Sequence, residues 1–164
     1  MKILVLSDSH GEVEGMVRAV RKVRPDMIFH LGDGWRDAQS LAEEFPEVPL
    51  FQVAGNCDYR NNLEREQVVQ VDGKRILLCH GHTLGVKQGL REAEAEVRRQ
   101  GVDALLFGHT HTPLVELRGN VLFMNPGSIG MAYPPSYGVL IVEDGQLKPR
   151  ICRTLERSRQ FSFR

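Results

Sequence analysis

The sequence predicts an α/β protein in which a sandwich of sheets has helices on its outside. Short apolar runs alternate with amphipathic helical patterns in the first part of the chain, and strand patterns joined by tight turns dominate the second part. The 164 residues include 41% hydrophobic side chains, which is enough to bury one core of ordinary size. We therefore expect a single domain that spans residues 1–164.

Five apolar runs predict buried strands, because each is short and is bounded by glycine and polar residues. They occupy residues 3–6, 27–31, 50–54, 76–79 and 104–107. Three patterns that contain glycine predict hairpin turns between further strands. These turns lie at residues 71–74, 117–121 and 142–146.

Apolar residues at helical spacing predict three helices between the strands. The first covers residues 13–23 and ends ahead of Pro25, which disfavours helix in the residue before it. A shorter helix is expected over 38–45. The third pattern covers residues 86–97, and Gly101 is a plausible residue to end it.

The composition argues against several classes of protein. The formal net charge is zero, which is unlike proteins that coat nucleic acids or anionic membranes. The longest apolar runs, such as 104–107, are far shorter than the ~20 residues of a membrane helix. Three cysteines are too few for a disulfide framework, and the chain begins without a signal-peptide pattern. We expect a cytoplasmic protein without membrane contact.

The C-terminal segment, residues 148–164, is basic, with Glu156 as its single acidic residue. Its pattern predicts an edge strand followed by a solvated tail. Nucleic-acid contact is the alternative, which the balanced charge of the whole chain makes less attractive.

Polar clusters follow the five apolar runs and contain five of the six histidines. Ligands collect at the carboxyl ends of strands in sheets covered by helices, so these clusters predict one common site. The site residues expected from the clusters are Asp8, His10, Asp33, Asn56, His80, His82, His109 and His111.

Asp, Asn and neutral His are ligands for Mn²⁺, Fe or Zn²⁺, whereas a cysteine-rich zinc site is excluded. Without His82, seven candidate ligands remain, which is too many for one catalytic ion with an open position. If Asp33 bridges, they divide into two sites of four, the arrangement of two-metal phosphatases and nucleases. Two divalent ions, two carboxylates and a hydroxide leave a net positive charge, which suits an anionic phosphoester.

These motifs, in this order, resemble the calcineurin-like metallophosphoesterase superfamily, and most closely its small single-domain bacterial and archaeal phosphodiesterases. The resemblance extends from residue 1 to about residue 142 and includes the motif at 125–128. It implies a four-layer α/β/β/α sandwich of two mixed sheets, with a dimetal site at one end. One ion would be held by Asp8, His10, Asp33 and His111. The other would be held by Asp33, Asn56, His80 and His109.

The chain departs from the superfamily pattern at two places. Many relatives follow the metal-binding Asn with a histidine thought to protonate the leaving group, but this chain has Cys57 there, as the small branch often does. The proton donor is therefore unassigned, and His82 is our hypothesis for the donor or for a substrate contact. Relatives also often carry an arginine soon after the 125–128 motif, and this chain does not.

The sequence thus predicts a dimetal phosphoesterase that hydrolyses a small phosphodiester by in-line attack of a metal-bridging hydroxide. Mn²⁺ is the expected ion, with Fe, Zn or Ni as alternatives. The sequence is also compatible with a homo-oligomer. A non-catalytic scaffold is the alternative, because the retromer vacuolar-sorting subunit uses this fold after losing part of its ligands. A nuclease with extended nucleic-acid contacts is disfavoured, because such relatives carry capping domains that 164 residues cannot supply.

Three further polar features have structural interpretations. His30 lies inside an apolar run and is expected to be a core residue or to support the site. Asp58 is expected to cap a turn or to support Asn56, and direct ligation of a metal is the less favoured alternative. The 125–128 motif is expected to form a turn first and a supporting loop second.

Overall fold

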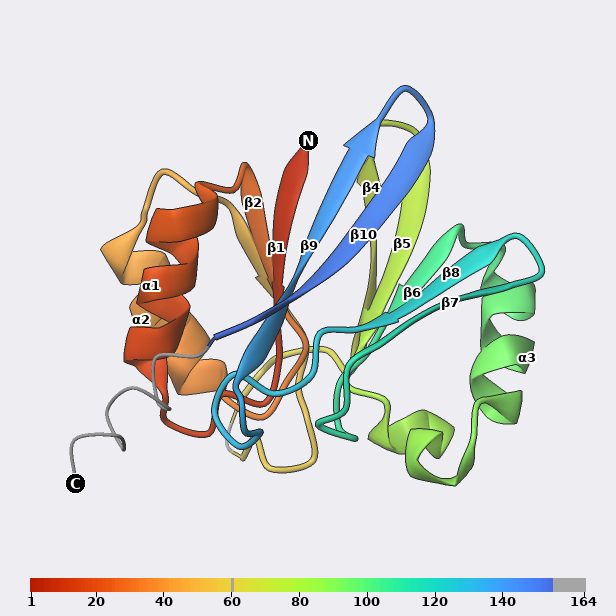
Figure 1. Cartoon of the computed structure of the whole chain (residues 1–164). Helices are drawn as coiled ribbons and strands as arrows, with labels where there is room; N and C mark the ends of the chain where they lie inside the picture. The colour runs from red at the N-terminus through yellow and green to blue at the C-terminus, as the bar shows by residue number, and fades with distance from the viewer. Residues whose placement is uncertain (60, 155–164) are drawn as a thin grey trace.

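In the computed structural model, which describes residues 1–59 and 61–154, two five-stranded sheets lie between layers of helix (Figure 1). The first sheet has the order β10-β9-β1-β2-β3, and the second has the order β4-β5-β6-β8-β7. The strands are β1 (Lys2–Leu6), β2 (Met27–His30), β3 (Leu50–Gln52), β4 (Glu66–Val71), β5 (Lys74–Cys79), β6 (Ala104–Leu106), β7 (Leu114–Arg118), β8 (Val121–Asn125), β9 (Ser136–Glu143) and β10 (Gln146–Arg153). The helices are α1 (Val13–Val23), α2 (Trp35–Glu44) and α3 (Arg91–Gln100), with short 3-10 turns η1 (His82–Leu84) and η2 (Val86–Gln88).

Both sheets are mixed. β1 pairs with β2 in parallel and with β9 antiparallel, while β6 pairs in parallel with both β5 and β8. Figure 1 shows α1 and α2 on the outer side of one sheet and α3 on the outer side of the other. The expected α/β/β/α sandwich is therefore confirmed.

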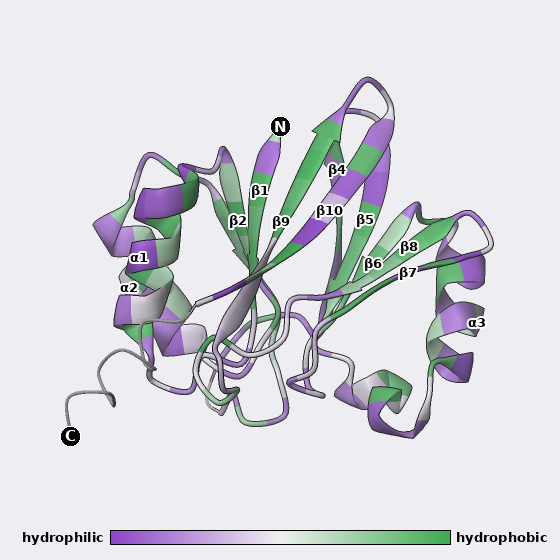
Figure 2. Cartoon of the chain, viewed as in Figure 1, coloured by the Kyte–Doolittle hydropathy of each residue, from purple (hydrophilic) through white to green (hydrophobic). Residues whose placement is uncertain are grey.

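Alternation along the strands builds the layers, because successive side chains point to opposite faces. In β1, Ile3 and Val5 belong to the core between the sheets, whereas Leu4 and Leu6 pack with residues of α1 such as Met16. A third cluster packs α3 against the outer face of the second sheet. Figure 2 shows the same pattern as apolar strands between helices with polar outer faces.

Most elements agree with the sequence predictions, and the turns at 71–74, 117–121 and 142–146 join paired antiparallel strands. The prediction for residues 86–97 was wrong at its start. Residues 86–88 form the 3-10 turn η2, and Gly89 has φ +122°, which breaks the helical path before α3 begins. α2 begins at Trp35, three residues before the predicted start at 38.

The structure describes residues 148–154 of the basic C-terminal segment. β10 is an edge strand of the first sheet, as expected, and residues 155–164 lie outside the described part of the chain. Among the described helices, none combines the length and apolar character that a membrane crossing requires.

Candidate metal centre

The loops that follow β1, β2, β5 and β6 bring six predicted ligands together. Side-chain atoms of Asp8, His10 and His111 all lie within 4.8 Å of one another, and so do those of Asp8, Asp33 and His80. Asp8 belongs to both groups. His109 joins them because its Nδ1 lies 3.2 Å from Nε2 of His80.

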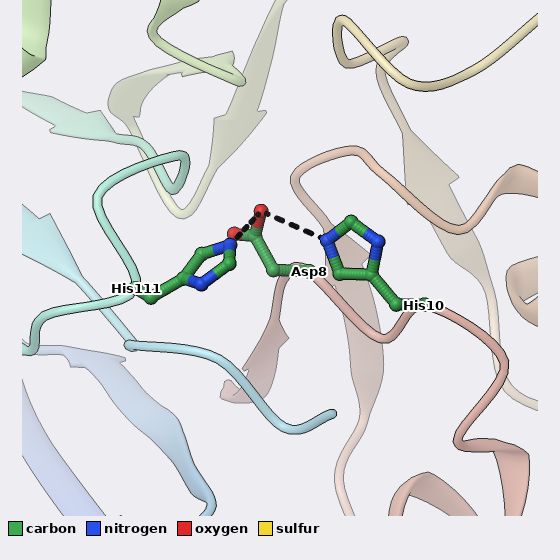
Figure 3. Close-up of side chains that lie close together, drawn as sticks. All are labelled: Asp8, His10 and His111. Atoms are coloured by element: carbon green, nitrogen blue, oxygen red, sulfur yellow. Dashed lines mark ion pairs between the residues drawn. The ribbon is translucent and has the colours of Figure 1, made fainter. Parts of the chain in front are cut away.

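Asp8 uses its two carboxylate oxygens differently. Oδ2 accepts hydrogen bonds from the Ser7 hydroxyl (2.6 Å) and the His109 backbone N–H (3.1 Å). Oδ1 is buried and accepts no hydrogen bond from the described residues. It lies 3.2 Å from Nε2 of His111 and 3.8 Å from Nε2 of His10, and Figure 3 shows these two rings directed toward the carboxylate.

Asp33 repeats this division. Its Oδ1 accepts the Cys57 backbone N–H at 2.8 Å. Its Oδ2 lies 3.3 Å from Nε2 of His80 and 3.7 Å from Nε2 of His10. Each aspartate is therefore oriented by a backbone amide through one oxygen and presents the other oxygen to imidazole nitrogens.

His80 is fixed in one tautomer by the backbone. Its Nδ1 lies 2.8 Å from the Leu31 carbonyl oxygen, which can only accept, so Nδ1 carries a hydrogen. Nε2 of the neutral ring then presents a lone pair toward the two aspartates. A ligating histidine is commonly oriented in this way by a hydrogen bond from its other ring nitrogen.

The electrostatics of the cluster favour a cation between the carboxylates. Burial opposes ionisation of Asp33, but the hydrogen bond and the charge of His80 outweigh it and lower the pKa of Asp33. Burial likewise opposes protonation of His80, but the hydrogen bond with Asp33 and the charge of Asp8 raise the pKa of His80. Burial and the neighbouring His80 lower the pKa of His109 to about 4.

Asn56 is the seventh predicted ligand and lies beside Asp33. Its neighbours Gly55 and Cys57 both approach the Asp33 carboxylate. The exposed Asn56 side chain donates from Nδ2 to Cys57 Sγ at 3.5 Å. The structure therefore brings the backbone of Asn56 to the cluster, while the side-chain amide of Asn56 is hydrogen-bonded to Cys57.

Two glycines allow the loops to approach one another this closely. A Cβ on Gly55 would collide with Oδ1 of Asp33. A Cβ on Gly108 would collide with Oγ of Ser7 and would lie 2.6 Å from Oδ2 of Asp8. No larger residue fits at either position without moving an aspartate.

Five predicted ligands have a left-handed backbone conformation. Among the described residues, eight non-glycine residues have positive φ, and five of them are in this cluster. This conformation is costly for residues other than glycine, so it persists only where surrounding contacts impose it, often at functional sites. The five are Asp8 (φ 54°), His10 (φ 42°), Asp33 (φ 60°), His109 (φ 71°) and His111 (φ 63°).

Asp58 holds two of the loops together. Its carboxylate accepts four backbone N–H groups, from Asp33 (2.8 Å), Gly34 (2.9 Å), Trp35 (3.1 Å) and Gly55 (2.7 Å). It therefore caps the N-terminus of α2 and locks that end against the Asn56 loop. This role agrees with the supporting function expected for Asp58.

The 125–128 motif joins the loops after β1 and β6. The Asn125 side chain donates to the Gly108 carbonyl and to the Thr110 hydroxyl, both at 3.0 Å. The Ser128 hydroxyl donates to the Asp8 carbonyl at 2.8 Å. The 125–128 motif thus forms a loop that supports the site, which agrees with the second of its two expected roles.

His30 supports the site through buried hydrogen bonds. The Gly32 N–H donates to Nδ1 of His30 at 3.2 Å, so Nε2 carries the hydrogen and donates to the Ser9 hydroxyl at 2.9 Å. The Ser9 hydroxyl in turn donates to Asp37 at 2.8 Å. This series of hydrogen bonds links β2, the loop after β1 and α2. It agrees with the buried supporting role expected for His30.

His82 lies at the edge of the cluster. Its ring centroid is 5.5 Å from that of His80 and 6.1 Å from that of His109. Its Nδ1 is buried and has no hydrogen-bond partner among the described residues. Burial and the neighbouring His80 lower the pKa of His82, so its ring is mainly neutral near pH 7.

The residues present fit divalent cations. The donor set consists of carboxylate oxygens and imidazole nitrogens, which suits Mn, Fe or Zn. The buried Oδ1 of Asp8 has no hydrogen bond in the described residues, although burying such an oxygen without a partner is costly. A cation between this oxygen and the imidazole nitrogens would satisfy it.

Comparison with known proteins agrees with this chemistry. Residues 1–145 match the model of the calcineurin-like phosphoesterase superfamily domain. The chain belongs to this superfamily. The probable metallophosphoesterase YsnB of Bacillus subtilis is 32% identical over 149 residues, covering 88% of this chain and 86% of YsnB. Phosphodiesterase YfcE of Escherichia coli K12 is 29% identical over 168 residues, covering 85% of this chain and 87% of YfcE.

Two solved structures of other proteins have the same fold. A conserved Streptococcus pneumoniae TIGR4 protein, described as a predicted phosphoesterase, has a TM-score of 0.80 and 26% identity, covering 93% of this chain and 88% of that protein. Vps29 of Entamoeba histolytica, in a complex with Zn²⁺, has a TM-score of 0.72 and 23% identity, covering 93% of this chain and 99% of Vps29. This chain is accordingly a metal-dependent phosphoesterase of the superfamily.

Sequence reasoning missed several residues that shape the centre. The buried hydroxyls of Ser7 and Ser9 donate to Asp8 and Asp37, but serines in a loop after a strand carry no distinctive signal. Trp35 and Tyr59 were also missed, although a tryptophan two residues after Asp33 was visible in the sequence.

Proposed function

We propose that the chain hydrolyses a small phosphodiester with two divalent ions held at this end of the sandwich. The observation that carries the proposal is the pair of aspartates, Asp8 and Asp33. Each directs one carboxylate oxygen toward imidazole nitrogens at 3.2–3.8 Å, while its other oxygen is fixed by a backbone amide.

Two ligand sets follow from the superfamily pattern. One ion would be held by Asp8, His10, Asp33 and His111, and the other by Asp33, Asn56, His80 and His109. When bound, such ions make a water-derived nucleophile available at neutral pH and neutralise charge on the phosphate. Mn²⁺ is the ion we propose, with Fe, Zn and Ni as alternatives, and a Vps29 structure contains Zn²⁺.

The residues of this chain contribute position and charge. Backbone amides orient Asp8 and Asp33 before any ligand arrives, so little reorganisation accompanies binding. The Leu31 carbonyl sets the tautomer of neutral His80, so Nε2 is the ring nitrogen directed to the centre. An anionic phosphodiester would then be placed for in-line displacement.

His82 is proposed to contact the ester group that departs. Its unpartnered Nδ1 and its place beside His80 and His109 support a substrate contact. The lowered pKa of His82 makes the contact the better of its two candidate roles, because a mainly neutral ring is a weak reservoir of protons.

The leaving group separates the two roles of His82. If His82 donates the proton, His82→Ala loses much more activity on a phenyl ester than on a p-nitrophenyl ester, because only the poorer leaving group needs protonation. A substrate contact predicts similar losses on both. Full activity of His82→Ala on the phenyl ester would contradict both roles. Thr83→Ala, at the exposed neighbouring position, is the control.

Hydrolysis of bis-p-nitrophenyl phosphate with added Mn²⁺ tests the function. We expect turnover that EDTA abolishes and that Asp33→Asn lowers by more than about 100-fold, because even residues that support a ligand cost 10- to 100-fold. Asp144→Asn is the matched control, because Asp144 also has positive φ (51°) but lies in the β9–β10 turn.

The alternative is a non-catalytic scaffold that binds protein partners. It is not favoured, because all seven ligand positions of the superfamily are filled in this chain. Purified protein that binds no metal and hydrolyses no phosphoester would return this alternative to first place. The cytoplasmic location and the oligomeric state stay predictions.

A further inference from the structure

A pocket of about 320 Å³ opens beside the candidate metal centre. Its lining includes His10 and Asp33, which belong to the centre, so the pocket continues directly from the place proposed for the phosphate. Its other side is formed by the start of α2 and by the loop that follows Asn56. The pocket is therefore where one ester group of a bound phosphodiester would extend.

Planar side chains line this outer side. Trp35, Arg36 and Tyr59 all contribute to the pocket wall. The Arg36 guanidinium carbon lies 5.3 Å from the centroid of the Trp35 ring, and the Trp35 indole N–H donates to the Tyr59 carbonyl at 3.1 Å. Tyr59 is 74% exposed, the highest value among the large apolar side chains in the described residues.

On the outer side of the pocket, Asp37 and Asp58 already accept hydrogen bonds from the protein, whereas Arg36 has no ion-pair partner among the described residues. Asp37 accepts hydrogen bonds from the Ser9 hydroxyl and the Gly11 N–H, and Asp58 accepts four backbone amides. Arg36 is exposed and forms no ion pair with the described residues. The outer side of the pocket thus offers aromatic surface and one cation, whereas the carboxylate of Asp33 on its inner side belongs to the metal centre.

We propose that this pocket binds a planar heteroaromatic ring on the ester group of the substrate, so that the natural substrate is a nucleotide-like phosphodiester. The proposal rests on the phosphodiesterase function proposed above. Aromatic side chains and arginine planes are the groups on which nucleobases stack in proteins, largely without preference for one base. A cation beside them suits a ligand whose other end is a phosphate.

The chain contains a single tryptophan, so its fluorescence reports on this pocket directly. We would titrate the metal-free protein, in EDTA, with uridine 5′-monophosphate and separately with ribose 5-phosphate. Stacking predicts saturable quenching by the nucleotide and none by the sugar phosphate. Tyr59→Ala should weaken nucleotide binding by about 5-fold or more, since stacking on an aromatic residue contributes at least about 1 kcal/mol per base.

The controls use exposed residues outside the pocket. Leu117→Ala matches Tyr59→Ala, because Leu117 is 71% exposed on the edge strand β7. Arg98→Ala, on α3, removes an exposed arginine that lies outside the pocket. Both controls should keep the nucleotide affinity of the unchanged protein. No quenching, or equal quenching by the two ligands, would overturn the proposal.

An activity comparison separates this proposal from the proposed function. Thymidine 5′-(p-nitrophenyl phosphate) and methyl p-nitrophenyl phosphate share one leaving group and differ in the remaining ester. We expect a higher kcat/KM for the thymidine ester, and a ratio that falls about 5-fold or more in Tyr59→Ala but not in Leu117→Ala. Equal kcat/KM values without nucleotide quenching would refute the ring pocket while the phosphodiesterase function stands. Quenching without hydrolysis of either ester would refute the function while the pocket stands.

Discussion

Asp8 and Asp33 show how single residues prepare the centre before any ion binds. Both have positive φ. In each, one carboxylate oxygen accepts a hydrogen bond from a backbone N–H, and the other oxygen faces histidine rings. Such a conformation needs close neighbours to impose it. Gly108 is such a neighbour of Asp8. The Cα of Gly108 lies so close to the side chains of Ser7 and Asp8 that only a hydrogen atom fits between them.

Gly108→Ala should therefore damage both stability and metal binding. We expect a loss of about 1–3 kcal/mol in the free energy of unfolding, as for overpacked cores, together with weaker Mn²⁺ binding. Urea unfolding in EDTA and calorimetric Mn²⁺ titration measure the two effects. Gly15→Ala is the control, because a Cβ there meets ordinary contacts of 3.4 Å or more inside α1. It should stabilise by about 0.5–1 kcal/mol. Equal effects of the two substitutions would contradict this account of Gly108.

His30 should make stability depend on pH. Burial lowers the pKa of His30 below its ordinary value of 6.5, although the carboxylates of Asp58, Asp8 and Asp37 act in the opposite direction. A proton on Nδ1 would also break the hydrogen bond from Gly32. The unfolded chain binds this proton more readily, so the contribution of neutral His30 is complete above about pH 6.5 and is lost as the pH falls through the lowered pKa.

The His30→Gln variant isolates this effect. In EDTA, the unfolding free energy of the unchanged protein should fall faster below pH 6.5 than that of the variant, by up to about 1.4 kcal/mol per pH unit for one proton. Urea unfolding between about pH 8 and pH 5 provides the measurement. Parallel curves for the two proteins would show that His30 titrates alike in both states.

At the scale of elements, α2 depends on a loop that is distant in sequence. The N-cap position of α2 is Gly34, whose missing side chain leaves the first amides of the helix without a local partner. Asp58 supplies the acceptor from the loop after β3 and also binds the amides of Asp33 and Gly55. One carboxylate thereby positions two of the ligand-bearing loops.

We expect Asp58→Ala to lower the unfolding free energy by about 2–4 kcal/mol, because four amides lose a charged acceptor. Metal affinity should fall with it. Asp103→Ala is the control, since the Asp103 carboxylate accepts the exposed Arg75 amide at 2.8 Å, and it should cost about 1 kcal/mol. Thermal and urea unfolding compare the two variants. A cost for Asp58→Ala no greater than that of the control would refute the cap.

Elements with a regular local pattern were predictable from the sequence, and those fixed by distant contacts were not. The apolar spacing in residues 13–23 gave α1 with its correct bounds, because one face of that helix is buried. The early start of α2 was missed because its cap comes from Asp58, 23 residues beyond Trp35. The approach of His80 to Asp33 depends on the packing of two sheets. The polar clusters at the strand ends predicted a common site, but the assignment of His80 and Asp33 to one ion came from the family resemblance.

At the scale of the whole molecule, the centre joins the two sheets. Asp8, His10 and Asp33 follow strands of the first sheet, whereas His80 and the pair His109 and His111 follow strands of the second. The apolar core between the sheets sets the distance between these two groups. An ion held by both would therefore act as a link across the sandwich, at the end where the loops meet.

Metal binding should consequently stabilise the entire fold. An ion present at 100 times its dissociation constant adds about 2.7 kcal/mol, which for a chain of this size raises the Tm by about 5–11 °C. We expect this shift with Mn²⁺, its reversal by EDTA, and its loss in Asp33→Asn but not in Asp144→Asn. Calorimetry measures the shift, and amide hydrogen exchange locates it. Because the ligands come from both sheets, slower exchange should reach β1 and β6 together. Protection confined to one sheet would mean that the ion does not link them.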